Sequence, residues 1–500
     1  MNTARMVLPA VLLVYFLWRS TRQRVFLLGL PFLMTMYYSI FFDGLKPFWL
    51  PYQWSEVSDH MMFWLVVTWI IYFDLLLPER RRSVRERRLL GPRLSGPEEL
   101  VLLAFLGYML LRVGLTAVQH MDLGSAISQA RVLLYAFVGY FLLRGVFAHA
   151  GRRATLDFLE AVVVVNTIAA ALFVLHQGFH LPGIYVNVIE HSYIVFGGQV
   201  LTRSFYFMPQ FLPLAIAYCA ARWRWSVLWM GVLLVSLGAV WVSYTRALVA
   251  VAVVEILLVL AVRLLRRGDV WPAVKRAAQI GLIVAVFVAI ALAVMPTQSA
   301  YLFSRITGTS ARGSVAADEN VEARLSWWRT TSEWVGKGNR EFGMGFPTPG
   351  QDGRVTRVEE MSADSVWVLM LWNLGLVGVA GLACVFTVYA WRAATMSFAG
   401  DDDAAMLSLV LLGVIVAVFL QGFVQWTVFD PWHTPAALWF LALVAVERYR
   451  QRVGAHETVA GVARTVAANQ RPVFDTAPHQ RMHDGILGFQ GSGPGRGGPR

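Results

Sequence analysis

Repeated apolar runs of about 17 to 25 residues constrain this chain most, because that length crosses the hydrocarbon core of a bilayer as a helix. Hydrophobic residues make up 57% of the 500 residues and charged residues only 15%. Backbone groups in lipid must be satisfied within the spanning element, and the short alternating segments of a membrane barrel do not occur in this sequence. We therefore predict an all-α fold, a polytopic transmembrane helical bundle of about 12–13 spans. The runs lie at about 6–18, 25–42, 60–77, 100–118, 129–147, 156–178, 205–221, 226–243, 247–264, 279–295, 366–390, 405–425 and 434–447.

Basic residues between these runs predict the orientation of the bundle. Arginine-rich clusters alternate along the chain, at 19–24, 80–93, 152–153, 222–224, 263–276 and 448–452. Short cytoplasmic loops carry an excess of Lys and Arg, so these links are assigned to the cytoplasm and the remaining links to the outside of the cytoplasmic membrane. The first run ends in Arg19 without a small-residue cleavage site, so no cleavable signal peptide is predicted.

Four regions follow from this pattern. Residues 1–295 are predicted to be transmembrane helices with short loops, and residues 366–447 to be the C-terminal transmembrane helices. Between them, 296–365 forms one large outer loop with short helices, and chemistry is expected there because loops carry function on a rigid scaffold. Residues 448–500 end in GFQGSGPGRGGPR, a composition that cannot bury a core, so a disordered basic cytoplasmic tail is predicted.

Several kinds of site are not indicated by the sequence. It lacks the phosphate-binding pattern GxxxxGK[ST], which argues against an ATP-driven pump, and it lacks HExxH and other metal-ligand spacings. The two cysteines, Cys219 and Cys384, both lie in apolar runs and are predicted to be small packing residues. We therefore expect neither a metal nor a cofactor.

Three arginines stand out on the predicted outer face. Arg203 precedes a span, Arg246 lies in a minimal turn between two spans, and Arg324 lies in an amphipathic segment of the large loop, where Arg305 is a further candidate. Guanidinium groups hold phosphate oxygens in a bidentate fashion and stay charged at physiological pH, so their convergence would suit a diphosphate. The structural alternatives are an interfacial anchor for Arg203 and a loop salt bridge for Arg324. Arg246 has a span on each side, where an unpaired charge is costly, so function is favoured there.

Two acidic residues have both a functional and a structural interpretation. Asp364 directly precedes the span after the large loop, where it can act as a general base towards a hydroxyl or can cap the helix. Glu255 lies within a span, where it marks either an ion pathway or a structural pair with an arginine such as Arg112 or Arg144. We favour the structural interpretation for Glu255.

The large loop is also rich in tryptophan. Trp327, Trp328 and Trp334 follow one another closely in its amphipathic segment. They form either a surface on which a sugar stacks, with Trp328 as the candidate for substrate binding, or an aromatic belt at the membrane interface.

The order of these features resembles a known family. A turn bearing Arg246 is followed by an R-x-x-x-W element (Arg324 to Trp328), a G-x-G (Gly343 to Gly345), and a polar residue entering a span that reads WNLGLVG. This order resembles the O-antigen ligase and O-antigen polymerase superfamily of bacterial membrane glycan transferases, over roughly residues 200–446. Arg203 before the proline-bearing span FMPQFLPL also fits the pattern.

The resemblance implies a C-type glycosyltransferase-like membrane fold and a metal-independent transferase. A saccharide would pass from a polyprenyl (undecaprenyl-type) diphosphate to a hydroxyl of a glycan or lipid-linked glycan, at the outer face of the cytoplasmic membrane. The diphosphate-binding arginines of the family map onto Arg203, Arg246 and Arg324. Ligases typically carry a histidine where alignment on GLVG (Gly375 to Gly378) places Asp364, which weakens assignment as a lipopolysaccharide ligase and favours a polymerase or another transferase.

The alternative function is a transporter or flippase of lipid-linked saccharide. Such a protein is expected to show pseudo-symmetric halves and broken central helices, neither of which is clear in the sequence. The polar residues of this sequence instead gather on one predicted face of the membrane. The transferase interpretation, with Asp364 as the base and the arginines on the diphosphate, is therefore preferred.

Overall fold

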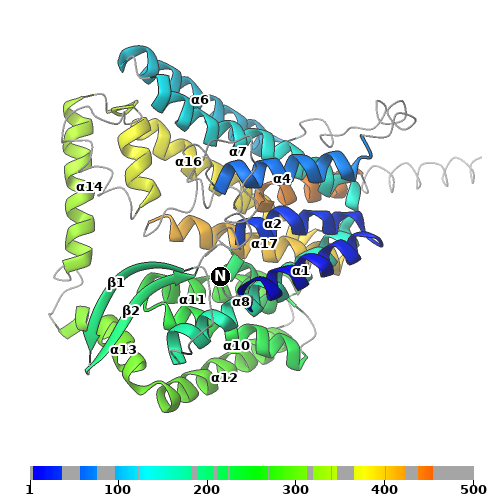
Figure 1. The fold of residues 1–500 in the computed structure, drawn as a ribbon, viewed down its shortest axis with the longest axis vertical. Coiled ribbons are helices and arrows are strands. Elements are labelled where there is room, and N and C mark those ends of the chain that lie inside the picture. The colour runs from blue at the N-terminus through cyan, green and yellow to red at the C-terminus, as the bar shows by residue number, and fades with distance from the viewer. Residues whose placement is uncertain are drawn as a thin grey trace, which may run out of the picture. The chain divides into compact units, whose positions relative to one another are not determined.

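The computed structural model describes residues 4–36, 57–75, 96–120, 123–179, 181, 188–196, 198–206, 211–222, 226–267, 270–311, 319–338, 340–345, 365–399, 401–423, 437 and 439–453. The chain divides into two compact units, residues 1–451 and 452–500. The elements that matter for function all belong to the first unit. Figure 1 shows its ribbon.

Helices dominate the first unit. They are α1 (Ala4–Ser20), the 3₁₀ helix η1 (Arg24–Leu28), α2 (Gly29–Met36), α4 (Val57–Tyr72), α6 (Pro97–His120), α7 (Leu123–Ala150), α8 (Arg152–Phe179), α9 (Phe211–Ala221), α10 (Val227–Val242), α11 (Arg246–Arg267), α12 (Val270–Val294), α13 (Pro296–Ala311), α14 (Glu319–Lys337), α16 (Val366–Phe398) and α17 (Asp402–Gln421). A further helix covers 439–453. Among described residues, seven helices are long and apolar enough to cross a membrane, and five shorter apolar helices have 10–17 residues. The predicted helical bundle is confirmed.

The core of the bundle forms around α17 and the helix at 439–453. Helix α17 packs against α9, α11 and α16, and its side chains from Leu407 to Val418 are mostly buried. Aromatic rings fill the space between helices distant in sequence: Trp439 stacks on Phe158 of α8 at 5.7 Å and meets Phe211 of α9 edge-on at 6.4 Å. Such ring pairs contribute about 0.5–1.5 kcal/mol beyond the area they bury.

A β-hairpin is the main departure from the predicted all-helical pattern. Strand β1 (Val188–Phe196) pairs antiparallel with β2 (Gln199–Tyr206), and the hairpin lies beside α13 in Figure 1. Both strands are rich in β-branched and aromatic residues, and Gly198 supplies the positive φ of 76° that the turn requires. The predicted run at 205–221 therefore begins as a strand, and its helix starts only at Phe211.

Helix α16 is broken at Gly375, where φ is 65° and ψ is −157°. Segment 340–345, which contains the G-x-G, fills the break. Met344 and Gly345 donate backbone hydrogen bonds to carbonyls of the first half, at Trp372 (2.7 Å) and Asn373 (3.2 Å). In return, the backbone N–H groups of residues 376 and 377, in the second half, donate to the carbonyls of residues 340 and 341 at 3.1 Å each. The loop thus caps both helix ends that the break leaves open.

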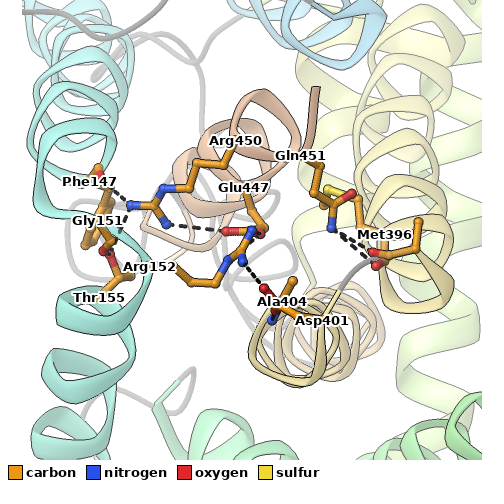
Figure 2. Close-up of polar contacts among 11 residues, drawn as sticks. Phe147, Gly151, Arg152, Thr155, Met396, Asp401, Ala404, Glu447, Arg450 and Gln451 are labelled. Carbon is orange, nitrogen blue, oxygen red and sulfur yellow. Dashed lines mark hydrogen bonds and ion pairs between the residues drawn. The ribbon is translucent and has the colours of Figure 1, made fainter. Parts of the chain in front are cut away.

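The helix ends predicted to be cytoplasmic meet in a polar network (Figure 2). Arg152, at the start of α8, pairs with Asp401 at 2.7 Å and with the buried carboxylate of Glu447 at 2.6 Å. Arg450 donates to the Phe147 carbonyl at 2.6 Å. These contacts join the α7–α8 link, the start of α17 and the C-terminal helix at one end, as the predicted alternation of spans requires. They also place residues 448–451 in the helical unit, although the tail was predicted to begin at 448.

The predicted pairing of Glu255 is wrong. Arg144 pairs with Glu99 at 2.7 Å, and Arg112 donates to the carbonyl of Gly343 at 3.3 Å. Glu255 is 1% exposed, and neither of its carboxyl oxygens has a hydrogen-bond partner among the described residues. Its carboxyl group faces α17, where a Cβ added at Gly413 would lie 3.4 Å from Oε1.

Candidate functional site

The turn between α10 and α11 is short, buried and strained. Tyr244 has a φ of 53°, which is uncommon for a bulky residue and costs roughly 1–2 kcal/mol. Local hydrogen bonds hold the turn: the Thr245 amide donates to Ser243 Oγ at 3.3 Å, and Thr245 Oγ1 donates to the Ser243 carbonyl at 3.1 Å. Helix α11 then begins at Arg246. The turn therefore fixes where the Arg246 side chain leaves the backbone.

Arg246 and Arg305 hold each other's backbone. Nη1 of Arg246 donates to the carbonyl of Arg305 at 2.9 Å, and Nη1 of Arg305 donates to the carbonyl of Tyr244 at 3.1 Å. Both guanidinium groups are half-buried. These bonds bring together two arginines that lie 59 positions apart in the chain.

The electrostatics at this point favour an anion. The N-terminus of a helix carries about half a positive charge from its unpaired N–H groups, and the first turn of α11 contains no acidic residue. An arginine is unfavourable for helix stability at that end, and here a second arginine lies beside it. The positive end of α11 and the two guanidinium groups together form the kind of site that binds phosphate.

Buried contacts anchor α13, which carries Arg305. Gln298 donates to the carbonyl of Gly178 at 3.3 Å, and Trp241 Nε1 donates to Ser299 Oγ at 3.2 Å. The first turn of α13 is thereby fixed to the ends of α8 and α10. Arg305 is thus held by an anchored helix within the region predicted to be a large outer loop.

An aromatic cluster connects the hairpin to the turn. The Tyr301 ring lies 5.3 Å from the ring of Tyr244 and 5.3 Å from the ring of Phe196 in β1. Burial, and to a smaller extent the neighbouring Tyr301, raises the pKa of the Tyr244 phenol, which therefore stays protonated. Arg203 lies on β2 opposite Ser192, and its side chain is outside the described residues. The hairpin that carries Arg203 therefore docks beside the Arg246–Arg305 pair.

Helix α14 carries the R-x-x-x-W element and packs on α16. Trp328 is half-buried and lies against the cluster of Val335, Leu371 and Trp372. The expected helix is present, and its face that carries Trp328 and Val335 packs through apolar side chains against α16. The side chain of Arg324, on the same helix, is outside the described residues.

Asp364 itself lies outside the described residues, but the start of α16 bears on its role. The cap residue of that helix is Ser365, whose Oγ accepts from the Val368 amide at 3.5 Å and donates to the Gly422 carbonyl at 3.2 Å. The capping role considered for Asp364 thus belongs to its neighbour.

Residues 231–383 match a protein family described as O-Antigen ligase. The matched segment includes the turn at Arg246, α13 with Arg305, α14 with Arg324, and the position of Asp364. The chain carries an O-antigen ligase domain. This confirms the resemblance drawn from the order of motifs, and it supports a multi-pass membrane enzyme of the glycosyltransferase type.

Other comparisons add little to the O-antigen ligase assignment. No curated protein matches the chain. One chain of a solved structure, described as "Structural coordination of polymerization and crosslinking by a peptidoglycan synthase complex", is similar at 16% identity. The similarity covers 69% of this chain and 97% of that chain, with a TM-score of 0.37, a level that carries no argument about function.

Three residues at this site were not predicted from the sequence. Tyr244 and Tyr301 lie in the matched segment and position the two arginines, and Arg112, from α6 outside that segment, donates to the Gly343 carbonyl of the G-x-G loop. The VSYTR segment offers a partial signal, since a bulky residue in a two- or three-residue link between helices must adopt an unusual backbone conformation. The role of Tyr301 depends on a contact across 57 positions, and nothing local in the sequence indicates it.

Proposed function

We propose that this protein transfers a saccharide from a polyprenyl-diphosphate carrier to a hydroxyl acceptor, itself a glycan or lipid-linked glycan, at the outer face of the cytoplasmic membrane. The acceptor oxygen attacks the anomeric carbon and forms the new C–O bond. The bond from that carbon to the diphosphate breaks, and its electron pair leaves with the diphosphate. The hydroxyl proton passes to Asp364, and in-line attack inverts the anomeric centre.

The observation that carries the proposal is the arginine pair at the N-terminus of α11. Arg246 and Arg305 bracket each other's backbone, so both guanidinium groups are preorganised before any substrate arrives. Preorganised donors aimed at developing charge contribute most to catalysis, and losing one costs about 2.7–4 kcal/mol, a factor of about 10²–10³ in rate. Arg203 and Arg324, on the adjoining hairpin and on α14, complete the diphosphate site in this proposal.

Trp328 is proposed to bind the substrate sugar. One part of its ring packs against α16, and the sugar stacks on the part that stays exposed. The aspartate at 364, where the family's ligases carry a histidine, favours a polymerase or another glycan transferase over a lipopolysaccharide ligase. The chemistry needs neither a metal nor a nucleotide sugar, because the diphosphate is already an activated leaving group.

The test uses the purified full chain in nanodiscs with polyprenyl-diphosphate oligosaccharide and candidate acceptors, in EDTA and without ATP. Release of polyprenyl diphosphate is followed for the wild type, Arg246→Ala and Asp364→Asn. The matched control is Arg329→Ala, an exposed arginine of α14. Acceptor-dependent release that falls about 100-fold or more in both site variants and stays near wild type in the control supports the proposal.

One observation favours the competing transport function and another argues against it. The break in α16 is the kind of discontinuous helix that transporters use to bind ions or substrates. Here, however, the chain's own segment 340–345 occupies both ends of the break through backbone hydrogen bonds. Translocation of lipid-linked saccharide across sealed vesicles, without acceptor-dependent release, would replace the transferase proposal with transport.

A further inference from the structure

A second site lies at the opposite end of the molecule from the arginine pair. A cavity of about 630 Å³ opens between α1 and α8 near the end of α9, within the size range of about 300–1,000 Å³ typical of ligand sites. Its walls are formed by Val11, Leu12, Tyr15, Arg19, Arg153, Asp157, Glu160, Ala161, Val164, Val165, Ile168 and Arg222.

The lining changes from polar to apolar along both helices. On α8 the stripe begins with Arg153, Asp157 and Glu160 and continues with apolar residues as far as Ile168, at the spacing of one helix face. On α1, which runs towards its polar end, the apolar residues come first and Arg19 comes last. The charged residues of both helices therefore gather at one end of the lining, called here its mouth, and the apolar residues line the rest. This is the profile of an amphipathic molecule.

The charges at the mouth are partly matched among themselves. Arg222 pairs with Glu160 at 3.1 Å and its guanidinium lies 4.4 Å from the Trp229 ring. Arg153 pairs with Asp157 at 3.3 Å. Both acidic groups are therefore already engaged by arginines.

Arg19 is the arginine left over. Its guanidinium lies 4.6 Å from the ring of Phe26, and its buried Nε has no hydrogen-bond partner among the described residues. No carboxylate among those residues pairs with it. Among the residues that line the cavity, three arginines are present with two carboxylates. Arg153 also lies 3.9 Å from Asp403, which is outside the lining, so the positive charge without a described carboxylate partner is that of Arg19.

We propose that this cavity binds one anionic glycerophospholipid of the phosphatidylglycerol class from the leaflet at the polar end. The phosphodiester receives charge-assisted hydrogen bonds from Arg19, with Arg222 and Arg153 at its flanks. An acyl chain lies between α1 and α8 along the apolar part of the lining. A net-neutral headgroup would leave the excess charge uncompensated, so phosphatidylethanolamine and phosphatidylcholine bind less well. The site does not depend on the proposed transferase activity.

The test is native mass spectrometry of the delipidated full chain with phosphatidylglycerol, phosphatidylethanolamine or phosphatidylcholine of identical acyl chains. We expect one tightly retained phosphatidylglycerol and at least about tenfold weaker binding of the other two lipids. Arg19→Gln should lower phosphatidylglycerol affinity about tenfold or more, whereas Arg22→Gln, a neighbouring exposed arginine that does not line the cavity, should leave it within about twofold.

A second variant tests the apolar part of the site without changing charge. Val164→Trp fills the slot between the helices and should reduce binding of the same lipid, with size-exclusion profiles confirming that both variants are folded. Equal retention of the three lipids, or unchanged affinity in folded Arg19→Gln, would overturn the proposal. Tighter binding of phosphatidylethanolamine than of phosphatidylglycerol would overturn it as well.

Discussion

Replacement of Gly375 by alanine tests whether the G-x-G loop holds the broken helix together. The φ of 65° and ψ of −157° at Gly375 lie in a region that is essentially restricted to glycine, so a side chain there costs about 1–3 kcal/mol in backbone strain. An added Cβ would also overlap the backbone of Gly343 and Glu341. Either the helix or segment 340–345 must therefore move.

The magnitude follows from the strain in the closed state. Four backbone hydrogen bonds, at 2.7–3.2 Å, join segment 340–345 to α16, and opening breaks them in the wild type and the variant alike. The backbone strain of about 1–3 kcal/mol is present only in the closed variant. It therefore raises the local opening constant about 5- to 150-fold, and the overlap of the added Cβ raises it further.

Limited trypsin digestion measures that opening. Lys337 lies just before segment 340–345 and Arg340 is its first residue, and both are exposed. Cleavage after them therefore reports the fraction of time for which the segment is detached. Gly281→Ala is the matched control, because this glycine of α12 has open space around it and an ordinary helical backbone. Equal cleavage rates for Gly375→Ala, Gly281→Ala and the wild type would refute the capping role of the loop.

Three further predictions concern the turn and the buried acid. Arg305→Ala should reduce polyprenyl diphosphate release about 100-fold. Arg305→Lys should restore little of it, because lysine lacks the planar guanidinium fork that donates to the Tyr244 carbonyl and presents further N–H groups to a phosphate in a fixed geometry. Full activity in the alanine variant would remove Arg305 from the site. Tyr244→Phe should leave polyprenyl diphosphate release within about twofold, since the Tyr244 hydroxyl has no hydrogen-bond partner among the described residues. Tyr244→Ala should lower the free energy of unfolding by about 3–5 kcal/mol, because it removes a buried ring. A large loss of release in the phenylalanine variant would show that the hydroxyl acts on substrate. Glu255→Leu should raise the melting temperature in detergent, because it removes a buried polar group without a described partner, and destabilisation would instead show that the carboxyl has an essential partner.

Features that depend on local pattern were predictable from the sequence. Where the structure describes them, the apolar runs other than the start of 205–221 coincide with helices, because transfer of about 20 apolar residues into lipid is favourable wherever they lie in the chain. Arg246 was identified for a similar reason, since a charged residue between two spans is costly without a function. The order of short motifs was sufficient to indicate the O-antigen ligase domain, which the family match at 231–383 confirms.

Features that depend on contacts between distant segments were decided by the tertiary structure alone. The break at Gly375 requires Gly343 from another part of the chain, and Arg305 joins Arg246 only because α13 is anchored to α8 and α10. The hairpin forms where strand-favouring residues are not required to span the membrane. Its composition alone was compatible with either a strand or a helix. Local propensity and hydrophobicity act over a few turns of helix, whereas these pairings gain their free energy from packing across dozens of residues, which no local pattern encodes.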